Sequence, residues 1–253
     1  PEIRKADMPA KLQEDSDLAS EVLNATALLY KQKPDGDMVM ACTATAFERD
    51  PGNQSGQKTY YFAAAGHCVA SDNTAHERVD LDAGNWFVTF DESITKSFIP
   101  AKVVAAGYQH RGDDFSVLKI VTDRDIQVIA LADTHARMGD ATLNIASPGG
   151  FGKQLFTGHI SLARLERPLK VGDINWENSL LLQMPVGGGS SGSAIVSIES
   201  RAIVGFMVGM LDGMSVAIPV DRFQDFWKDS RAGTYKWFKT EDGGPSLSKA
   251  DKK

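Results

Sequence analysis

Residues 186–196 read Val-Gly-Gly-Gly-Ser-Ser-Gly-Ser-Ala-Ile-Val, a glycine run that enters a turn of small residues and leaves it as an apolar strand. Glycine adopts backbone angles that other residues avoid, and it lets another segment of backbone approach closely. A serine in such a turn can expose its hydroxyl, and neighbouring N–H groups can converge on an anion. Acyl transfer by a serine needs both features. Taken alone, the same residues also fit a flexible loop between two strands.

Two stretches upstream favour the chemical interpretation. Tyr61–Val69 is an apolar strand that ends in small residues and presents His67. Asp113–Ile120 places an acid, Asp114, at the start of another strand. An imidazole titrates near neutral pH and can accept the proton of a serine hydroxyl, and a carboxylate can hold that imidazole in the required tautomer. The chemical groups therefore follow one another in the order histidine, aspartate, serine.

These motifs resemble those of chymotrypsin-fold serine proteases, whose triad follows the same order. Residues 64–68 resemble the family's alanine-alanine-histidine-cysteine signature, residues 114–119 its aspartate strand, and residues 189–193 its nucleophile turn. Residues 215–220 are similar to the end of the second barrel in high-temperature-requirement proteases, and the serine turn is nearer to glutamyl endopeptidases and to bacterial and viral members. The resemblance spans residues 24–230, and the few residues that follow imply a member without a PDZ domain.

The resemblance implies a serine endopeptidase that hydrolyses peptide bonds through an acyl-enzyme intermediate. Ser191 is then the nucleophile, His67 the general base, and Asp114 the residue that orients the imidazole. The N–H groups of Gly189 and Ser191 are the expected oxyanion hole, and no cofactor is expected. The alternative function is a catalytically silent relative that serves as a binding or scaffold module. An α/β-hydrolase would carry the order serine, acid, histidine, which differs from the order in this chain.

Two of the three triad positions have rivals close by. Ser190 and Ser193 lie in the same turn, but Ser191 alone has a glycine two residues before it and a glycine directly after it. Asp113 directly precedes Asp114. We interpret Asp113 as a solvated loop charge, because Asp114 is the residue that lies directly against the apolar strand.

The chain has two cysteines, Cys42 and Cys68. Their number alone leaves open a disulfide or two buried thiols. In the resembled fold the cysteine after the histidine pairs with one on the preceding strand, so the resemblance implies a Cys42–Cys68 bridge. Such a bridge indicates a secreted or periplasmic protein, and no signal peptide is visible in the sequence. A zinc site built from these cysteines, His67 and Asp114 lacks a closely spaced ligand pair, so no metal is expected.

The composition is that of an ordinary globular protein, with 253 residues of which 42% are hydrophobic and 24% are charged. The formal net charge of −6 argues against a nucleic-acid partner, which would need a basic face. No apolar run approaches the length of about 18 residues that a membrane-spanning helix needs. The expected partner is a protein or peptide substrate, and the sequence does not indicate the oligomeric state.

Twelve short apolar runs separated by turn residues predict an all-β fold of two antiparallel barrels or sandwiches, with a short N-terminal helix and a C-terminal helix. The resemblance implies the first of these, two six-stranded antiparallel β-barrels. The final helix is indicated by Phe223, Phe226 and Trp227, which fall on one helical face. The predicted strands are 25–30, 38–47, 58–65, 86–90, 101–107 and 115–120 in the first barrel, and 141–146, 154–163, 179–184, 194–198, 202–208 and 214–220 in the second.

The same pattern predicts how the chain is divided. The predicted parts are an N-terminal arm with a short helix (1–23), the first barrel with the histidine and aspartate (24–121), a linker (122–137), the second barrel with the serine (138–220), a helix (221–240) and a disordered tail (241–253).

Substrate in the resembled family lies as an extra strand along the run that corresponds to Gly205–Gly209, a form of β-augmentation. By this correspondence Phe206, Met207 and Val208 bind substrate, and Met207 stands where glutamyl endopeptidases have a histidine. The approach to the nucleophile lacks the acid that trypsin-like members keep there, and Val186 is apolar. We therefore predict an apolar primary specificity pocket.

Overall fold

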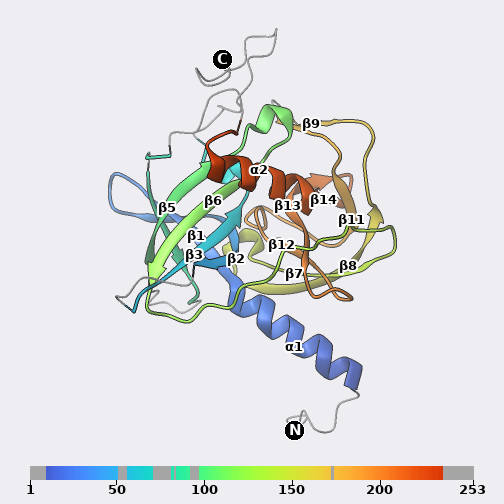
Figure 1. Cartoon of the computed structure of the whole chain (residues 1–253), viewed down its shortest axis with the longest axis horizontal. Helices are drawn as coiled ribbons and strands as arrows, with labels where there is room; N and C mark the ends of the chain where they lie inside the picture. Colours follow the sequence, from blue (N-terminus) through green and yellow to red (C-terminus); the bar gives the residue numbers. More distant parts are fainter. Residues whose placement is uncertain are drawn as a thin grey trace.

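A computed structural model describes residues 10–50, 56–70, 81–82, 84–91, 97–171 and 174–235. The described chain forms two closed antiparallel barrels that lie side by side, with a helix at each end of the chain (Figure 1). This architecture confirms the predicted fold class. The predicted tail, residues 241–253, lies outside the described residues.

The first barrel has six strands in the spatial order β1-β2-β3-β6-β5-β4. Most inward positions carry small, β-branched or aromatic residues, which pack well on a pleated surface. Its strands are β1 (Thr26–Gln32), β2 (Met38–Asp50), β3 (Lys58–Ala64), β4 (Asn85–Thr89), β5 (Ile99–Ala106) and β6 (Ser116–Thr122).

The second barrel also has six strands, in the order β11-β14-β13-β12-β7-β8. Its strands are β7 (Ala141–Ala146), β8 (Gln154–Leu162), β11 (Leu180–Gln183), β12 (Ala194–Ser197), β13 (Ile203–Leu211) and β14 (Met214–Pro219). A separate two-stranded sheet, which the sequence pattern did not predict, pairs β9 (Leu169–Val171) with β10 (Ile174–Trp176). Each of its strands has only three residues, too few for an alternating pattern to stand out from a loop.

Two α-helices flank the barrels (Figure 1). The N-terminal helix α1 (Ala10–Ala25) projects below the barrels in that view and buries Leu18 and Val22 in the core. The C-terminal helix α2 (Val220–Ala232) lies across the top of the view and ends at Gly233, whose φ of 69° is the left-handed conformation that commonly closes a helix.

An aromatic cluster joins the two barrels to α2. Phe115, at the entry to β6, stacks on Phe226 and meets Phe223 edge to face, with ring centroids 5.6 and 5.2 Å apart. The ring centroids of Phe206, in β13, and Phe223 lie 4.6 Å apart. Such ring pairs contribute beyond their buried area. The cluster therefore fixes the segment that carries Asp114 against the second barrel.

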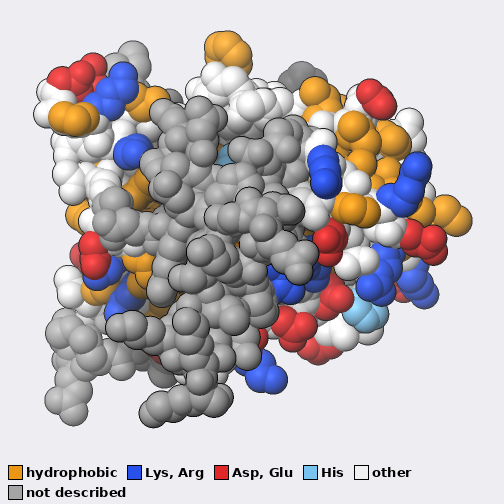
Figure 2. Space-filling model, turned by 90° about the horizontal axis from the view of Figure 1, so that it is seen from above, with side chains coloured by type: hydrophobic (Ala, Val, Ile, Leu, Met, Phe, Trp, Pro, Cys, Tyr) orange, Lys and Arg blue, Asp and Glu red, His pale blue; other side chains and the backbone are white. Residues whose placement is uncertain are grey.

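The surface seen in Figure 2 mixes acidic, basic and apolar side chains wherever described residues are visible. No single charge dominates that visible part, which agrees with the modest net charge of −6. Within the described ranges, every helix is too short or too polar to cross a bilayer.

Candidate active site

The first barrel brings His67 and Asp114 together through strand pairing. Ala64 at the end of β3 is paired with Ser116 at the start of β6 in an antiparallel register. His67 follows β3 in a short 3₁₀ helix, η2 (Gly66–Cys68), and Asp114 lies just before β6. Antiparallel pairing places the end of one strand beside the start of the next, so both side chains emerge at one end of the barrel.

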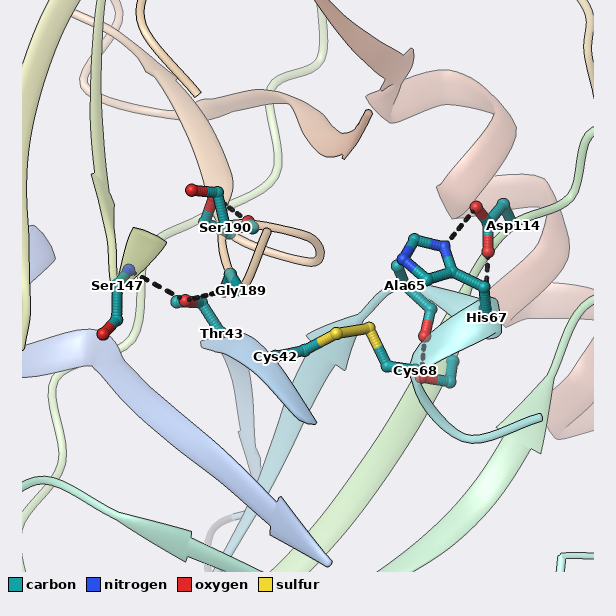
Figure 3. Close-up of a disulfide and its surroundings, with 11 residues drawn as sticks. Cys42, Thr43, Ala65, His67, Cys68, Asp114, Ser147, Gly189 and Ser190 are labelled. Atoms are coloured by element: carbon teal, nitrogen blue, oxygen red, sulfur yellow. Dashed lines mark hydrogen bonds and ion pairs between the residues drawn. A yellow bond between two sulfur atoms is a disulfide. The ribbon is translucent and has the colours of Figure 1, made fainter. Parts of the chain in front are cut away.

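The Asp114 carboxylate is fully buried and accepts three hydrogen bonds. Its Oδ1 atom lies 2.7 Å from the backbone nitrogen of His67, and its Oδ2 atom lies 2.7 Å from His67 Nδ1. The indole Nε1 of Trp176 lies 3.3 Å from the same Oδ2. The imidazole is thereby held at Nδ1, which leaves Nε2 as the nitrogen available for proton transfer. Figure 3 shows the ring bonded to Asp114 on one side and facing the part of the view that holds Gly189 and Ser190.

The contact between His67 and Asp114 shifts the pKa values of the two residues in opposite directions. Burial by itself would lower the pKa of His67, but the charge of Asp114 and its hydrogen bond outweigh burial and raise the pKa of His67 above its ordinary value. Burial by itself would raise the pKa of Asp114. The charge of His67 and the hydrogen bonds from His67 and Trp176 outweigh it, so the pKa of Asp114 is lowered. Asp114 is therefore ionised at neutral pH and favours an imidazolium beside it.

Cys42 on β2 and Cys68 in η2 form a disulfide, with Cα atoms 6.1 Å apart (Figure 3). The predicted bridge is confirmed, and it ties the turn that carries His67 to the neighbouring strand. The two sulfurs and a ring nitrogen of His67 lie within 4.8 Å of one another. Because zinc is bound by thiolates and a disulfide sulfur is not one, this cluster lacks thiolate ligands in the oxidised protein.

The serine turn is shaped by two glycines with positive φ, Gly189 at 98° and Gly192 at 86°. A Cβ atom on Gly192 would lie 2.5 Å from the Thr43 carbonyl oxygen and 2.7 Å from both Ala64 Cα and Ala65 N. The turn therefore packs directly on β2, on Ala64 at the end of β3, and on Ala65, two residues before His67. This contact brings the segment with Ser191 to the same end of the first barrel.

Backbone carbonyls of the turn are held by the surrounding strands and loops. Thr43 donates its Oγ1 hydrogen to the oxygen of Gly189 (2.8 Å) and its N–H to the oxygen of Ser191 (3.1 Å). The N–H of Gly149, in the 3₁₀ helix η4 (Pro148–Gly150), donates to the oxygen of Gly188 (2.6 Å). In a trans peptide the N–H points away from the preceding carbonyl. Because the Gly188 carbonyl points toward Gly149, the N–H of Gly189 in the same peptide group points away from Gly149.

The N–H groups of Gly189 and Ser191 donate to no acceptor within the described ranges. The three serines of the turn also differ. Ser193 Oγ donates to the Ser190 carbonyl (2.7 Å) and both Ser190 and Ser193 are buried, whereas Ser191 is half-buried. The Ser191 hydroxyl makes no hydrogen bond to His67 or to any other described residue. Serine-to-histidine bonds are often long before substrate binds, so this geometry is compatible with a resting site.

The predicted substrate-binding residues lie on and beside β13. Phe206, Met207 and Val208 are buried and Val186 is half-buried. The side of β13 that faces β12 and the serine turn is bonded as far as Met207, whose N–H donates to the Ser193 carbonyl (2.9 Å) and whose carbonyl accepts from the Gly192 N–H (2.7 Å). The other side of β13 stays paired with β14 to Leu211. The backbone beyond Met207 therefore offers an open edge on one side.

Sequence reasoning missed two residues around the site, Trp176 and Thr43, and misinterpreted a third, Asp113. Trp176 and Thr43 gave no signal, because their partners lie 62 and 146 residues away in the chain. The interpretation of Asp113 as a solvated charge is wrong. Its side chain is only 17% exposed, forms an ion pair with Arg222 of α2, and accepts a hydrogen bond from Tyr235 (2.8 Å). Arg222 and Tyr235 follow β14, more than 100 residues after Asp113, so the spacing of the sequence could not identify them as its partners.

The double barrel, with an Asp-bonded imidazole at the end where a glycine-rich serine turn packs, defines the class of chymotrypsin-like folds. Comparison with known proteins agrees with this class. Residues 44–206 match the family described as the trypsin-like peptidase domain. Because this match covers well over half of the chain, the chain belongs to the trypsin-like peptidase family.

Among curated proteins, the chain is similar to the periplasmic serine endoprotease DegP of Salmonella typhimurium, with 30% identity over 164 residues. That alignment covers 62% of this chain and 30% of DegP, so the chain spans less than a third of that relative's length.

Two solved structures share the fold. A crystal structure of the serine endoprotease from Yersinia pestis superposes with a TM-score of 0.62 and 19% identity, covering 91% of this chain and 70% of that one. The HtrA-type protease AlgW with tripeptide superposes with a TM-score of 0.64 and 19% identity, covering 90% and 66%. At this identity the likeness supports the fold.

Proposed function

We propose that this protein is a serine endopeptidase that cleaves peptide bonds through an acyl-enzyme. Ser191 Oγ attacks the substrate carbonyl while His67 Nε2 takes the hydroxyl proton, and the imidazolium then donates that proton to the departing amine. Asp114 keeps Nδ1 protonated and stabilises the imidazolium. Water repeats the sequence on the acyl-enzyme and releases the second product.

The observation that carries this proposal is the contact between the serine turn and the histidine segment. Gly192, directly after Ser191, packs on Ala64 and Ala65 with no room for a side chain. The Gly189 and Ser191 N–H groups are unengaged within the described residues, so they can bind the negative oxygen of a tetrahedral intermediate. A buried, ionised Asp114 with a raised His67 pKa is the electrostatic setting that a general base needs.

The proposed substrate is an extended peptide that pairs with the open edge of β13 beyond Met207. Val186 is half-buried beside the turn, and the predicted apolar primary pocket rests on this apolar lining. A library of peptides that differ at the residue before the cleaved bond tests it. Preferential cleavage after arginine or lysine would contradict the apolar pocket while leaving the peptidase proposal intact.

A fluorophosphonate probe tests the peptidase proposal directly, because it labels only a serine activated as a nucleophile. Wild-type protein should be labelled at Ser191, and the Ser191→Ala variant should lose labelling completely. Ser190→Ala is the matched control, since Ser190 is buried in the same turn, and it should keep most of the labelling. A folded wild type that stays unlabelled and cleaves no denatured protein would favour a silent binding or scaffold module instead.

The proposed location is an oxidising, extracytoplasmic compartment. The Cys42–Cys68 disulfide supports it because such bonds persist outside the reducing cytosol. The similarity to a periplasmic endoprotease points the same way.

A further inference from the structure

We propose that Trp176 is a positioning residue that holds the Asp114 carboxylate in the orientation His67 requires and links it to the substrate-binding edge of β13. This inference rests on the proposed function, since it assigns a role within that same site. Trp176 belongs to the small β9–β10 sheet rather than to either barrel.

The contact with the acid is specific in its chemistry. The indole Nε1 lies 3.3 Å from Asp114 Oδ2, the same oxygen that His67 Nδ1 approaches to 2.7 Å. Trp176 is 4% exposed and Asp114 is fully buried, so water is poorly placed to replace the indole N–H. Leaving a buried carboxylate oxygen without one of its donors costs free energy. The carboxylate is therefore expected to rotate toward another donor when the indole N–H is removed.

The other end of the indole rests on β13. A Cβ atom on Gly209 would lie 2.3 Å from Cη2 of the Trp176 ring. The six-membered edge therefore lies against the Gly209 backbone while the five-membered ring faces Asp114. Gly209 lies in the part of β13 that has no partner on the β12 side. One rigid side chain thus spans from the triad acid to the proposed substrate edge.

The strand that carries Trp176 is itself fixed to the Asp114 loop. A Cβ on Gly112, which has φ of 79°, would lie 2.4 Å from the Asn175 carbonyl oxygen. Arg222 of α2 donates to the carbonyl oxygens of Glu177 (2.7 Å) and Arg111 (3.1 Å). These contacts hold the residues on both sides of Trp176 against the loop that precedes Asp114, so the indole is placed by its surroundings.

The decisive variant is Trp176→Phe, which keeps an aromatic ring and removes the N–H donor. Without that donor, the Asp114 charge acts more fully on the imidazolium, so His67 should titrate at higher pH by about half a pH unit. An NMR titration of the His67 ring measures this without any need for turnover. In kinetics, kcat/KM should fall about tenfold and its acid limb should move to higher pH. Trp227→Phe is the matched control, because Trp227 donates to Glu48 (2.9 Å), and it should change neither measurement.

The other charged groups near Asp114 do not account for a shift of the His67 titration in Trp176→Phe. Asp113 is paired with Arg222 and Tyr235, and Arg111 is exposed on η3 (Gln109–Arg111). None of them gains or loses a partner when the indole N–H is removed. A shift of the His67 titration in Trp176→Phe therefore reports on the contact between Trp176 and Asp114.

If Trp176→Phe fails to fold, Gly209→Ala tests the same link, because the added methyl group would lie 2.3 Å from Cη2 of the ring and the indole must shift, which disturbs its contact with Asp114. The same upward shift of the His67 titration is expected. An unchanged His67 titration in a folded Trp176→Phe or Gly209→Ala variant overturns the inference. Failure of the proposed function gives a different result, namely an unlabelled wild type, and the His67 titration remains measurable in that case.

Discussion

The two barrels contribute to the site in different ways. The first barrel supplies side chains held by other side chains and by a covalent bond: Asp114 fixes His67, and the disulfide from Cys42 ties down the turn that carries it. The second barrel supplies a backbone shape, in which Gly189 and Gly192 have positive φ and the carbonyls of the turn are bound by neighbours. The contribution of the first barrel depends on which functional groups its side chains carry. The contribution of the second barrel depends on glycines that carry no side chain.

This difference predicts which substitutions damage each half. In the first barrel, an isosteric change that alters one functional group should abolish activity and leave the fold intact. In the second, an added methyl group should be harmful even though it removes no functional group. The predictions below test this contrast, and those on activity are in order of decreasing expected effect.

The largest effect is expected for Asp114→Asn. The amide cannot hold Nδ1 protonated as the carboxylate does, so kcat/KM should fall by about 10³ to 10⁴-fold. Because the Asp114 charge raises the pKa of His67, its removal should move the acid limb of the residual activity to lower pH. Asp113→Asn is the control, since Asp113 bonds to Arg222 and Tyr235 rather than to His67. An equal loss of activity in both variants would refute the assignment of the acid.

The same pair sets part of the pH dependence of stability. The pKa of His67 is higher in the folded than in the unfolded protein. It therefore stabilises the fold at pH values below the unfolded-state pKa, and this stabilisation is lost as the pH rises through the folded-state pKa. The lowered pKa of Asp114 contributes above its unfolded pKa, and this is lost as pH falls through the folded value. Denaturant unfolding of Asp114→Asn across acidic to neutral pH should therefore show a flatter profile than wild type.

The second barrel is tested by Gly192→Ala. The new Cβ would lie 2.5 Å from the Thr43 oxygen, at a φ of 86° that alanine adopts only with strain of about 1–3 kcal/mol. Displacing the turn by even about 1 Å should lower kcat/KM by about 10²-fold. Gly188→Ala is the matched control, because a Cβ there meets nothing within 4 Å. Equal stability and labelling of the two alanine variants would show that the turn tolerates side chains.

The contrast between the barrels also explains what the sequence could predict. Strand periodicity predicted an all-β fold of two barrels or sandwiches. The motifs around His67, Asp114 and Ser191 resemble those of a known family, and this resemblance implied the barrels and the residues proposed as a triad. Both signals are local in the sequence. The Trp176 and Thr43 contacts join segments 62 and 146 residues apart, and no local pattern encodes which loops meet. Asp113 was misread for the same reason, since Arg222 reaches it from α2.

The smallest effect on activity is expected from removal of the disulfide in the double variant Cys42→Ala with Cys68→Ala. Its cysteines are 26 residues apart, and closing a loop of this size contributes about 3–4 kcal/mol on the chain-entropy model. The free energy of unfolding should fall by about that amount in denaturant titrations. Wild type should lose the same amount in reductant, and the double variant should not respond to reductant.

Activity of the folded double variant should nevertheless stay within a few-fold of wild type. The backbone N–H of His67 and its Nδ1 both remain bonded to Asp114, and Ser116 Oγ still donates to the Ala65 carbonyl (3.0 Å). These bonds hold the histidine turn without help from the sulfur bridge once the barrel has folded. Complete loss of probe labelling in the folded double variant would mean instead that the covalent tie, and not the carboxylate, sets the position of His67. The first barrel would then depend on connectivity as strictly as the second depends on glycine.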